Sequence, residues 1–158
     1  MDQEKSTKSA TIQSMINKIT VCSSVSFYKD CLELEEELIK MGFKVLLPVT
    51  AYVMKKTGNY DVSSYKTWFK DKGDYGKKAE LIRQHFAKIA EGDVILVVNN
   101  KKHGVAGYIG ANVLMEMGLA FHLNKPIFIL NEIADDNQFK EEIFGMNPVF
   151  LNGDLKTL

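Results

Sequence analysis

The chain has 158 residues, of which 46% are hydrophobic and 25% are charged, and twenty Lys and Arg side chains balance twenty Asp and Glu. This length favours one domain that buries roughly two thirds of the surface exposed in its unfolded chain. The charge balance argues against nucleic-acid binding, which needs a basic excess, and no segment has the roughly 20 apolar residues that span a bilayer. We interpret the short lysine runs at 55–56, 77–78 and 101–102 as solvated surface.

The first residues, 1–16, are polar and hold too little apolar surface to offset the cost of ordering them. They also lack the continuous apolar stretch of a secretory signal peptide. We therefore expect a disordered leader at 1–16, a single folded domain at 17–158 and a cytoplasmic protein.

Alternating apolar runs and helical patterns follow the leader. Strands are predicted at 18–22, 43–47, 93–98, 125–130 and 148–151. Helical periodicity appears at 28–41, at 78–91 and from Asn112, a good N-cap, onward. Strands that alternate with helices predict an α/β fold, a three-layer α/β/α sandwich around a doubly wound, five-stranded parallel sheet of the Rossmann or flavodoxin-like type.

The segment at 50–76 breaks this alternation because it is polar and rich in aromatic residues. Its aromatic side chains are Tyr52, Tyr60, Tyr65, Trp68, Phe69 and Tyr75. Such a segment could form a lid, a base-stacking wall or a dimer contact. A loop with a short helix, packed on its own aromatic side chains, fits the sequence equally well.

Ligands of open α/β sheets bind outside the carboxyl ends of the strands, which here selects the loops at 23–26, 99–110 and 131–132. Neither a GxGxxG motif nor a GKS or GKT motif occurs, so a dinucleotide dehydrogenase and a P-loop ATPase are not supported. The serine-rich turn, Ser23, Ser24 and Ser26, could bind phosphate through hydroxyl and backbone N–H groups. Alternatively, one of these serines only caps the following helix.

The two cysteines, Cys22 and Cys31, do not form a CxxC motif, and no histidine pair has zinc-binding spacing. The sequence therefore supports neither a structural zinc site nor a disulfide framework. We predict no metal and no cofactor.

Glu116 lies in the most informative segment, 107–120, where a glycine-rich turn leads into a helix. Helical spacing from Val113 and Ala120 places its carboxylate at the edge of the buried stripe, facing the ligand crevice. A half-desolvated carboxylate is suited to attack an electron-poor sugar carbon. The alternative is a glutamate that only stabilises the macrodipole at the N-terminus of the helix.

Three segments occur in a characteristic order: a first strand that ends in serines, LIRQHFAKIAEGDVILVV, and a glycine-rich turn before NVLMEMGLAFHLNKPIFIL. Together they resemble the nucleoside 2-deoxyribosyltransferase-like superfamily, which includes the 2'-deoxynucleoside 5'-phosphate N-hydrolases. The resemblance covers roughly 18–130. Its most specific part is Glu-x-Gly-x-Ala at 116–120, followed by an Asn-Lys-Pro turn into a strand.

The resemblance assigns roles to individual residues. Glu116 matches the nucleophilic glutamate that attacks the anomeric carbon and expels the base. Ser23 and Ser24 match the turn that holds the sugar or its 5'-phosphate. Gly110 and Asn112 match the turn before the nucleophile, where family members often have Gly or Asp.

The main departure from the family is His85, which occupies the place of a catalytic aspartate. A histidine could replace that group as a proton donor, because its ordinary pKa is closer to neutrality, or could contact the ligand. A packed, hydrogen-bonded core histidine is the alternative. The loop from Asn99 to Tyr108 is longer than in typical hydrolases, so Tyr108 could stack on a base or only anchor the loop.

By resemblance, the expected function is cleavage or transfer at the N-glycosidic bond of a nucleoside or deoxynucleoside, or of its 5'-monophosphate. A homodimer or a larger homo-oligomer is also implied. One alternative is a non-catalytic nucleotide-binding or sensor domain that has lost the helper aspartate. A second, a phosphoribohydrolase of the cytokinin-activating type, is disfavoured because its PGG-containing turn is absent.

Overall fold

The computed structural model describes residues 15–158. The leader expected at 1–16 therefore lies almost entirely outside the described residues. Its last residue, Ile16, is partly buried against the hydrophobic core.

The five predicted strands form one parallel sheet in the order β2-β1-β3-β4-β5. The strands are β1 (Lys18–Ser23), β2 (Lys44–Leu46), β3 (Val94–Val98), β4 (Ile127–Ile129) and β5 (Val149–Phe150). The predicted α/β fold is confirmed, and the strand order is the flavodoxin-like one. Because β2 and β3 lie on opposite sides of β1, the strand order reverses between β1 and β3.

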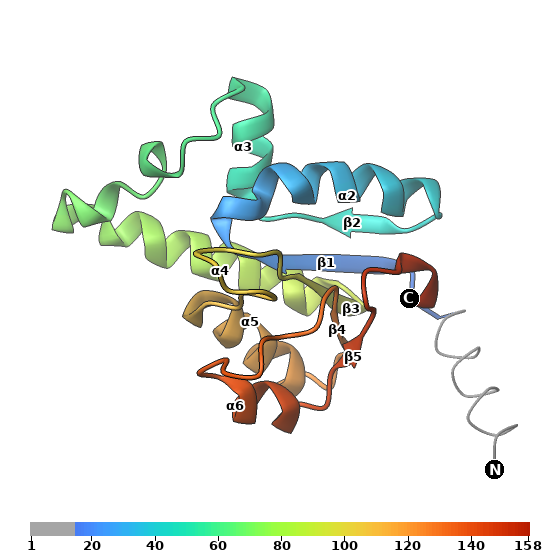
Figure 1. The fold of residues 1–158 in the computed structure, drawn as a ribbon. Helices are drawn as coiled ribbons and strands as arrows, with labels where there is room; N and C mark the ends of the chain where they lie inside the picture. The colour runs from blue at the N-terminus through green and yellow to red at the C-terminus, as the bar shows by residue number, and fades with distance from the viewer. Residues whose placement is uncertain (1–14) are drawn as a thin grey trace, which may run out of the picture.

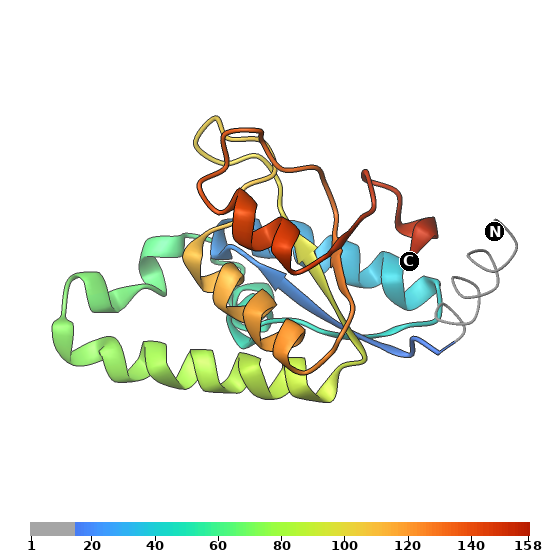
Figure 2. The same ribbon diagram turned by 90° about the horizontal axis from the view of Figure 1, so that it is seen from below.

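Helices cover both faces of the sheet and complete the three layers (Figures 1 and 2). The helices are α2 (Tyr28–Lys40), α3 (Val49–Thr57), α4 (Tyr75–Glu91), α5 (Ala111–His122) and α6 (Lys140–Gly145). Helix α2 lies on one face, together with the C-terminal 3-10 helix η5 (Leu155–Thr157), and α4, α5 and α6 lie on the other. Among residues 15–158, no helix is both long enough and apolar enough to cross a bilayer.

Strand β3 explains why the strand sequences lack polar alternation. Val94, Leu96 and Val98 pack into the core under α2, whereas Ile95 and Val97 pack into the core under α4, α5 and α6. All five side chains are almost completely buried. Each contributes roughly 1.5–3 kcal/mol of hydrophobic free energy, so a polar residue on either face would be costly.

The segment at 50–76 is more helical than its polar sequence suggests. Helix α3 begins after Pro48 and ends at Gly58, which has a left-handed backbone. Three short 3-10 helices follow, η2 (Val62–Ser64), η3 (Thr67–Phe69) and η4 (Lys72–Asp74), and α4 begins three residues before the predicted start. Both views show this segment and the start of α4 reaching beyond the sheet (Figures 1 and 2).

The prediction that Asn112 caps the third helix is wrong. Gly110, with extended backbone, caps α5, and Asn112 is the second residue inside the helix. The side chain of Asn112 instead bonds Glu116 and Lys78, so it is not free to cap the helix.

Candidate functional site

The site lies at the carboxyl ends of β1 and β3, where the strand order reverses and where open α/β sheets bind their ligands. The Ser23 hydroxyl donates a hydrogen bond of 2.8 Å to the Val98 carbonyl oxygen and so ties the two strand ends together. Two adjoining pockets open at this place. They share Val25, Tyr28, Lys66, Lys78 and Asn112 as lining residues.

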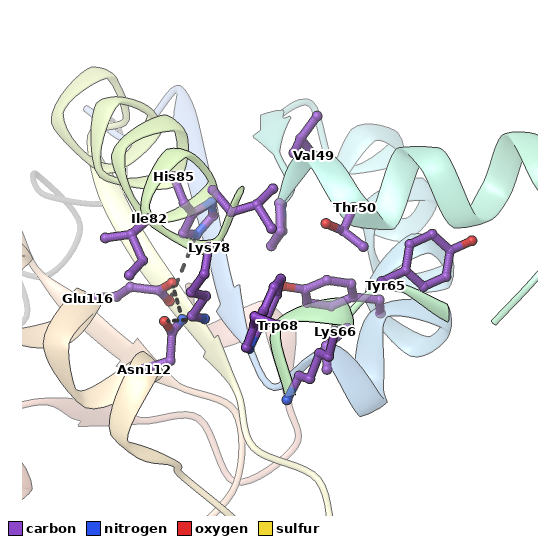
Figure 3. A pocket seen from close by; sticks show the side chains of 14 residues that line it. Val49, Thr50, Tyr65, Lys66, Trp68, Lys78, Ile82, His85, Asn112 and Glu116 are labelled. Carbon is purple, nitrogen blue, oxygen red and sulfur yellow. Dashed lines mark hydrogen bonds and ion pairs between the residues drawn. The ribbon is translucent and has the colours of Figure 1, made fainter. Parts of the chain in front are cut away.

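The first pocket, which we call the acid pocket, is lined by residues of α2, α3, α4 and α5 and of the segment between α3 and α4. It contains the buried side chains of His85 and Glu116. Apolar and aromatic side chains from α3, η3 and α4 form its walls, among them Trp68 and Tyr65. Figure 3 shows the two polar side chains on one side of this pocket, with Trp68 and Tyr65 across from them.

Glu116 is held in place from within its own helix. Its Oε1 accepts a hydrogen bond of 2.9 Å from Asn112 Nδ2, four residues earlier, while Lys78 Nζ donates to Asn112 Oδ1 at 3.0 Å (Figure 3). The other oxygen, Oε2, is buried and has no hydrogen-bond partner among the described residues. Burial raises the pKa of Glu116 to about 8, although the Cys22 thiol, Lys78 and Asn112 favour the charged form.

His85 reaches the same spot from α4 and is 6% exposed. Its Nε2 lies 3.9 Å from Glu116 Oε2 and 3.7 Å from the sulfur of Cys22, at the end of β1. Burial, with a further contribution from the charge of Lys88, lowers the pKa of His85 to about 4. The ring is therefore neutral near pH 7, which corrects the expectation that its pKa suits a proton donor and favours the role of a ligand contact.

The second pocket, which we call the lysine pocket, contains three ammonium groups, those of Lys66, Lys78 and Lys102. Burial and the charge of Lys66 lower the pKa of both Lys78 and Lys102. No carboxylate is among the residues that line this pocket. An anion would therefore relieve the mutual repulsion of these three groups.

Neutral donors complete the lysine pocket. Lys102 Nζ lies 3.0 Å from the hydroxyl of Ser24 and 4.9 Å from the ring centre of Tyr108. Gly110 places the start of the twelve-residue helix α5 at the pocket, and the N-terminus of a helix attracts anions. Hydroxyl, ammonium and helix N-terminus together form a surface suited to phosphate.

A glycine fixes the loop that carries Tyr108. Gly107 has a φ of 63°, and a Cβ at this position would overlap the carbonyl oxygen of Glu132, at the end of β4. The loop is therefore held against the neighbouring strand end, and Tyr108 faces the lysine pocket.

The structure brings most predicted site residues together but leaves two apart. Glu116, His85, Ser23, Ser24, Tyr108, Gly110 and Asn112 line one or both pockets. Ser26 is exposed and lines neither pocket. Asn99 also lines neither, because its side chain accepts from Asn131 N at 2.9 Å and donates to Asn131 O at 2.8 Å, which joins the ends of β3 and β4.

Several lining residues escaped the sequence interpretation. Lys78 and Lys102 belong to runs interpreted as solvated surface, yet they line the lysine pocket. Tyr28 begins α2, where it was counted only as part of a helix, and it borders both pockets. Trp68 belongs to the aromatic segment, but only the fold places it against α4, with Lys78 Nζ 5.5 Å from the centre of its ring. In the sequence, only the other aromatic residues around Trp68 indicate that this segment could line a binding site.

The fold and the site define an α/β protein with a flavodoxin-like sheet, in which a pocket lined by three lysines adjoins a pocket with two buried titratable side chains. Comparison with known proteins finds neither a family model nor a curated protein that matches the chain. The functional argument therefore depends on the geometry of these two pockets.

Proposed function

We propose that the protein cleaves the N-glycosidic bond of a nucleoside or deoxynucleoside 5'-monophosphate, with Glu116 as nucleophile. The observation that carries this proposal is the buried carboxylate of Glu116, which lines a pocket next to a second pocket that three lysines and no carboxylate line. A reactive oxygen beside an anion site is the arrangement that attack on a phosphorylated sugar requires.

The substrate would span both pockets. Its phosphate would bind Lys66, Lys78 and Lys102, with the Ser24 hydroxyl as a further donor, and this anchor favours a nucleotide over a nucleoside. The base would lie in the acid pocket against Trp68, which is 5% exposed and is held by its surroundings. This placement supports the base-stacking interpretation of the segment at 50–76.

The chemistry proceeds in two steps. The ionised carboxylate of Glu116 attacks C1' of the sugar, a C1'–O ester bond forms, and the C1'–N bond breaks with its electron pair leaving on the base, which takes a proton from water. Water then attacks C1', releases the sugar phosphate and returns the Glu116 carboxylate, while its spare proton goes to solvent. A second base in place of water gives transfer.

A non-catalytic nucleotide-binding domain is the second candidate function. It is favoured by the same burial that makes Glu116 reactive, since a pKa of about 8 leaves most of its carboxyl groups protonated near pH 7. The neutral His85 also supplies no proton to a leaving base at that pH. In this alternative the lysine pocket binds the nucleotide and no bond breaks.

The test is chromatography of a panel of nucleosides and nucleoside 5'-monophosphates, each incubated with the protein, with and without a second free base. We expect free base from one or more nucleotides with the wild type and none with Glu116→Gln. Glu35→Gln is the matched control, because Glu35 is also a buried carboxylate but accepts a hydrogen bond from Tyr52 and lines neither pocket.

Calorimetric titration with the same nucleotides separates the two candidates. Nucleotide binding without base release by the wild type contradicts the enzyme and supports the binding domain. The absence of both binding and release contradicts both functions.

The expected homo-oligomer stays a prediction. Helix α5 exposes Met115 and Phe121, which are 47% and 54% exposed, and such side chains are compatible with a contact between subunits. Light scattering in solution measures the oligomeric state directly.

A further inference from the structure

Three side chains with different metal-binding atoms meet at the base of the acid pocket. Cys22 comes from the end of β1, His85 from α4 and Glu116 from α5. Their sulfur, imidazole nitrogen and carboxylate oxygen all lie within 4.8 Å of one another, and all three residues are buried. Three elements far apart in sequence thus bring three kinds of ligand atom to one point.

The distances within this cluster are close to those of a tetrahedral metal site. Zinc binds sulfur, nitrogen and oxygen at about 2.0–2.3 Å, so adjacent ligand atoms in a tetrahedron are about 3.3–3.6 Å apart. The observed separations from His85 Nε2 are 3.7 Å to Cys22 and 3.9 Å to Glu116. Shifts of a few tenths of an ångström would bring these two pairs to the spacing of a tetrahedral site, and Cys22 and Glu116, whose ligand atoms lie within 4.8 Å of each other, would also have to approach.

A second observation points to a missing ligand. Glu116 is 5% exposed, and its Oε2, which faces His85, makes no hydrogen bond of good geometry among residues 15–158, although the neighbouring thiol of Cys22 favours the charged form of the carboxyl group. A buried polar atom of this kind is costly unless something binds it. A metal ion between Oε2, the imidazole and the thiolate would satisfy this oxygen.

We propose that Cys22, His85 and Glu116 form a binding site for one Zn²⁺ ion. The two anionic ligands, a thiolate and a carboxylate, balance the charge of the ion, so a neutral complex is buried. Sulfur and imidazole ligands select zinc over magnesium and calcium. His85 and Glu116 both line the acid pocket, which gives the ion an entry path and leaves a fourth position open to water.

Zinc and sugar chemistry would compete for the same oxygen. Binding of the ion displaces the thiol proton of Cys22 to solvent and occupies Oε2 of Glu116, which is then unable to attack C1'. Zinc therefore acts as an inhibitor of base release. Only this consequence rests on the function proposed above, because metal binding itself needs no activity.

Direct binding tests the site. The full chain is stripped with EDTA, exchanged into chelator-free buffer and titrated with Zn²⁺ against a chromophoric chelator, and with Co²⁺ to detect thiolate-to-cobalt charge-transfer absorption. We expect one ion per chain and a charge-transfer band. Cys22→Ser should remove the band and weaken Zn²⁺ binding at least ten-fold, and Glu116→Gln should weaken it similarly.

Cys31→Ser is the matched control, because Cys31 is also free and buried but lies in the opposite core, under α2. It should keep both the band and the affinity of the wild type. Circular dichroism of each variant shows whether it is folded. Binding of less than one ion per chain by the wild type, or an equal loss in Cys22→Ser and Cys31→Ser, overturns the proposal.

Base release in the presence of EDTA keeps the two proposals apart. Stoichiometric zinc binding without any base release supports the metal site and contradicts the glycosidase. If the protein releases base, binds no zinc and is not inhibited by zinc, the metal site is contradicted and the glycosidase is supported.

Discussion

The two adjoining pockets bury their titratable groups to different degrees. In the lysine pocket the ammonium groups of Lys78 and Lys102 are half-buried and have polar partners, Asn112 and Ser24. In the acid pocket Glu116 and His85 are almost fully buried, and burial moves the pKa of each toward its neutral form. Burial lowers the pKa of both lysines as well, so all four groups shift toward their neutral forms, but the shift is large only for the more deeply buried Glu116 and His85.

The largest expected effect concerns the stability of the acid pocket. A carboxyl group with a raised pKa binds its proton more tightly in the folded state, so stability is lost as the pH rises from the unfolded pKa toward about 8. Between about pH 5 and about pH 9, Glu116→Gln should gain on the order of 3 kcal/mol in unfolding free energy relative to the wild type. Urea unfolding of the wild type and the variant at both pH values measures this change in unfolding free energy. If the stability difference between the two proteins is the same at both pH values, Glu116 is not a buried carboxyl group with a raised pKa.

The second prediction is the pH dependence of base release in EDTA. Only the ionised Glu116 attacks, so kcat should rise about ten-fold per pH unit and level off near the pKa of about 8. Lys78→Met should move the rise to higher pH, because the charge of Lys78 lowers the pKa of Glu116. A profile that is flat below pH 8 would show that Glu116 is already ionised or is not the nucleophile.

The third prediction separates two neighbouring lysines. Lys78→Met should weaken binding of a nucleoside 5'-monophosphate roughly 10- to 100-fold, since a hydrogen bond to a charged group contributes about 1.5–3 kcal/mol. Lys77→Met is the control, because Lys77 is exposed and pairs with Asp74 at 3.0 Å outside both pockets. Calorimetry measures the affinity of both variants for the nucleotide. An equal loss of affinity in the two variants would show that the phosphate does not bind at Lys78.

The smallest expected effect is that of salt. Raising NaCl from about 0.05 M to about 0.5 M should weaken nucleotide binding several-fold, because mobile ions screen the half-buried lysines. Binding of the corresponding nucleoside, which lacks the phosphate, should change little. Equal salt dependence for both ligands would contradict a phosphate in the lysine pocket.

Local patterns were sufficient to predict the framework of the molecule. The unbroken apolar character of β3 follows from burial on both faces, and this requirement acts on every residue of the strand. The position of Glu116 on the buried edge of α5 follows from helical spacing in the same way. For helix α3 the sequence offers only an alternative, a loop with a short helix, because its nine residues start at a proline-capped turn within a polar, aromatic segment, where local signals conflict.

The sequence by itself therefore determined the α/β alternation, the edge of the sheet where the two pockets open and the helix that carries Glu116. Tertiary structure alone decided that Cys22 and His85 meet Glu116, that three scattered lysines surround one pocket, and that Asn99 ties two strands together. The physical reason is the distance along the chain over which each property is determined. Backbone conformation depends on near neighbours in the chain, whereas pKa values and ligand geometry depend on burial and on charges brought together by folding.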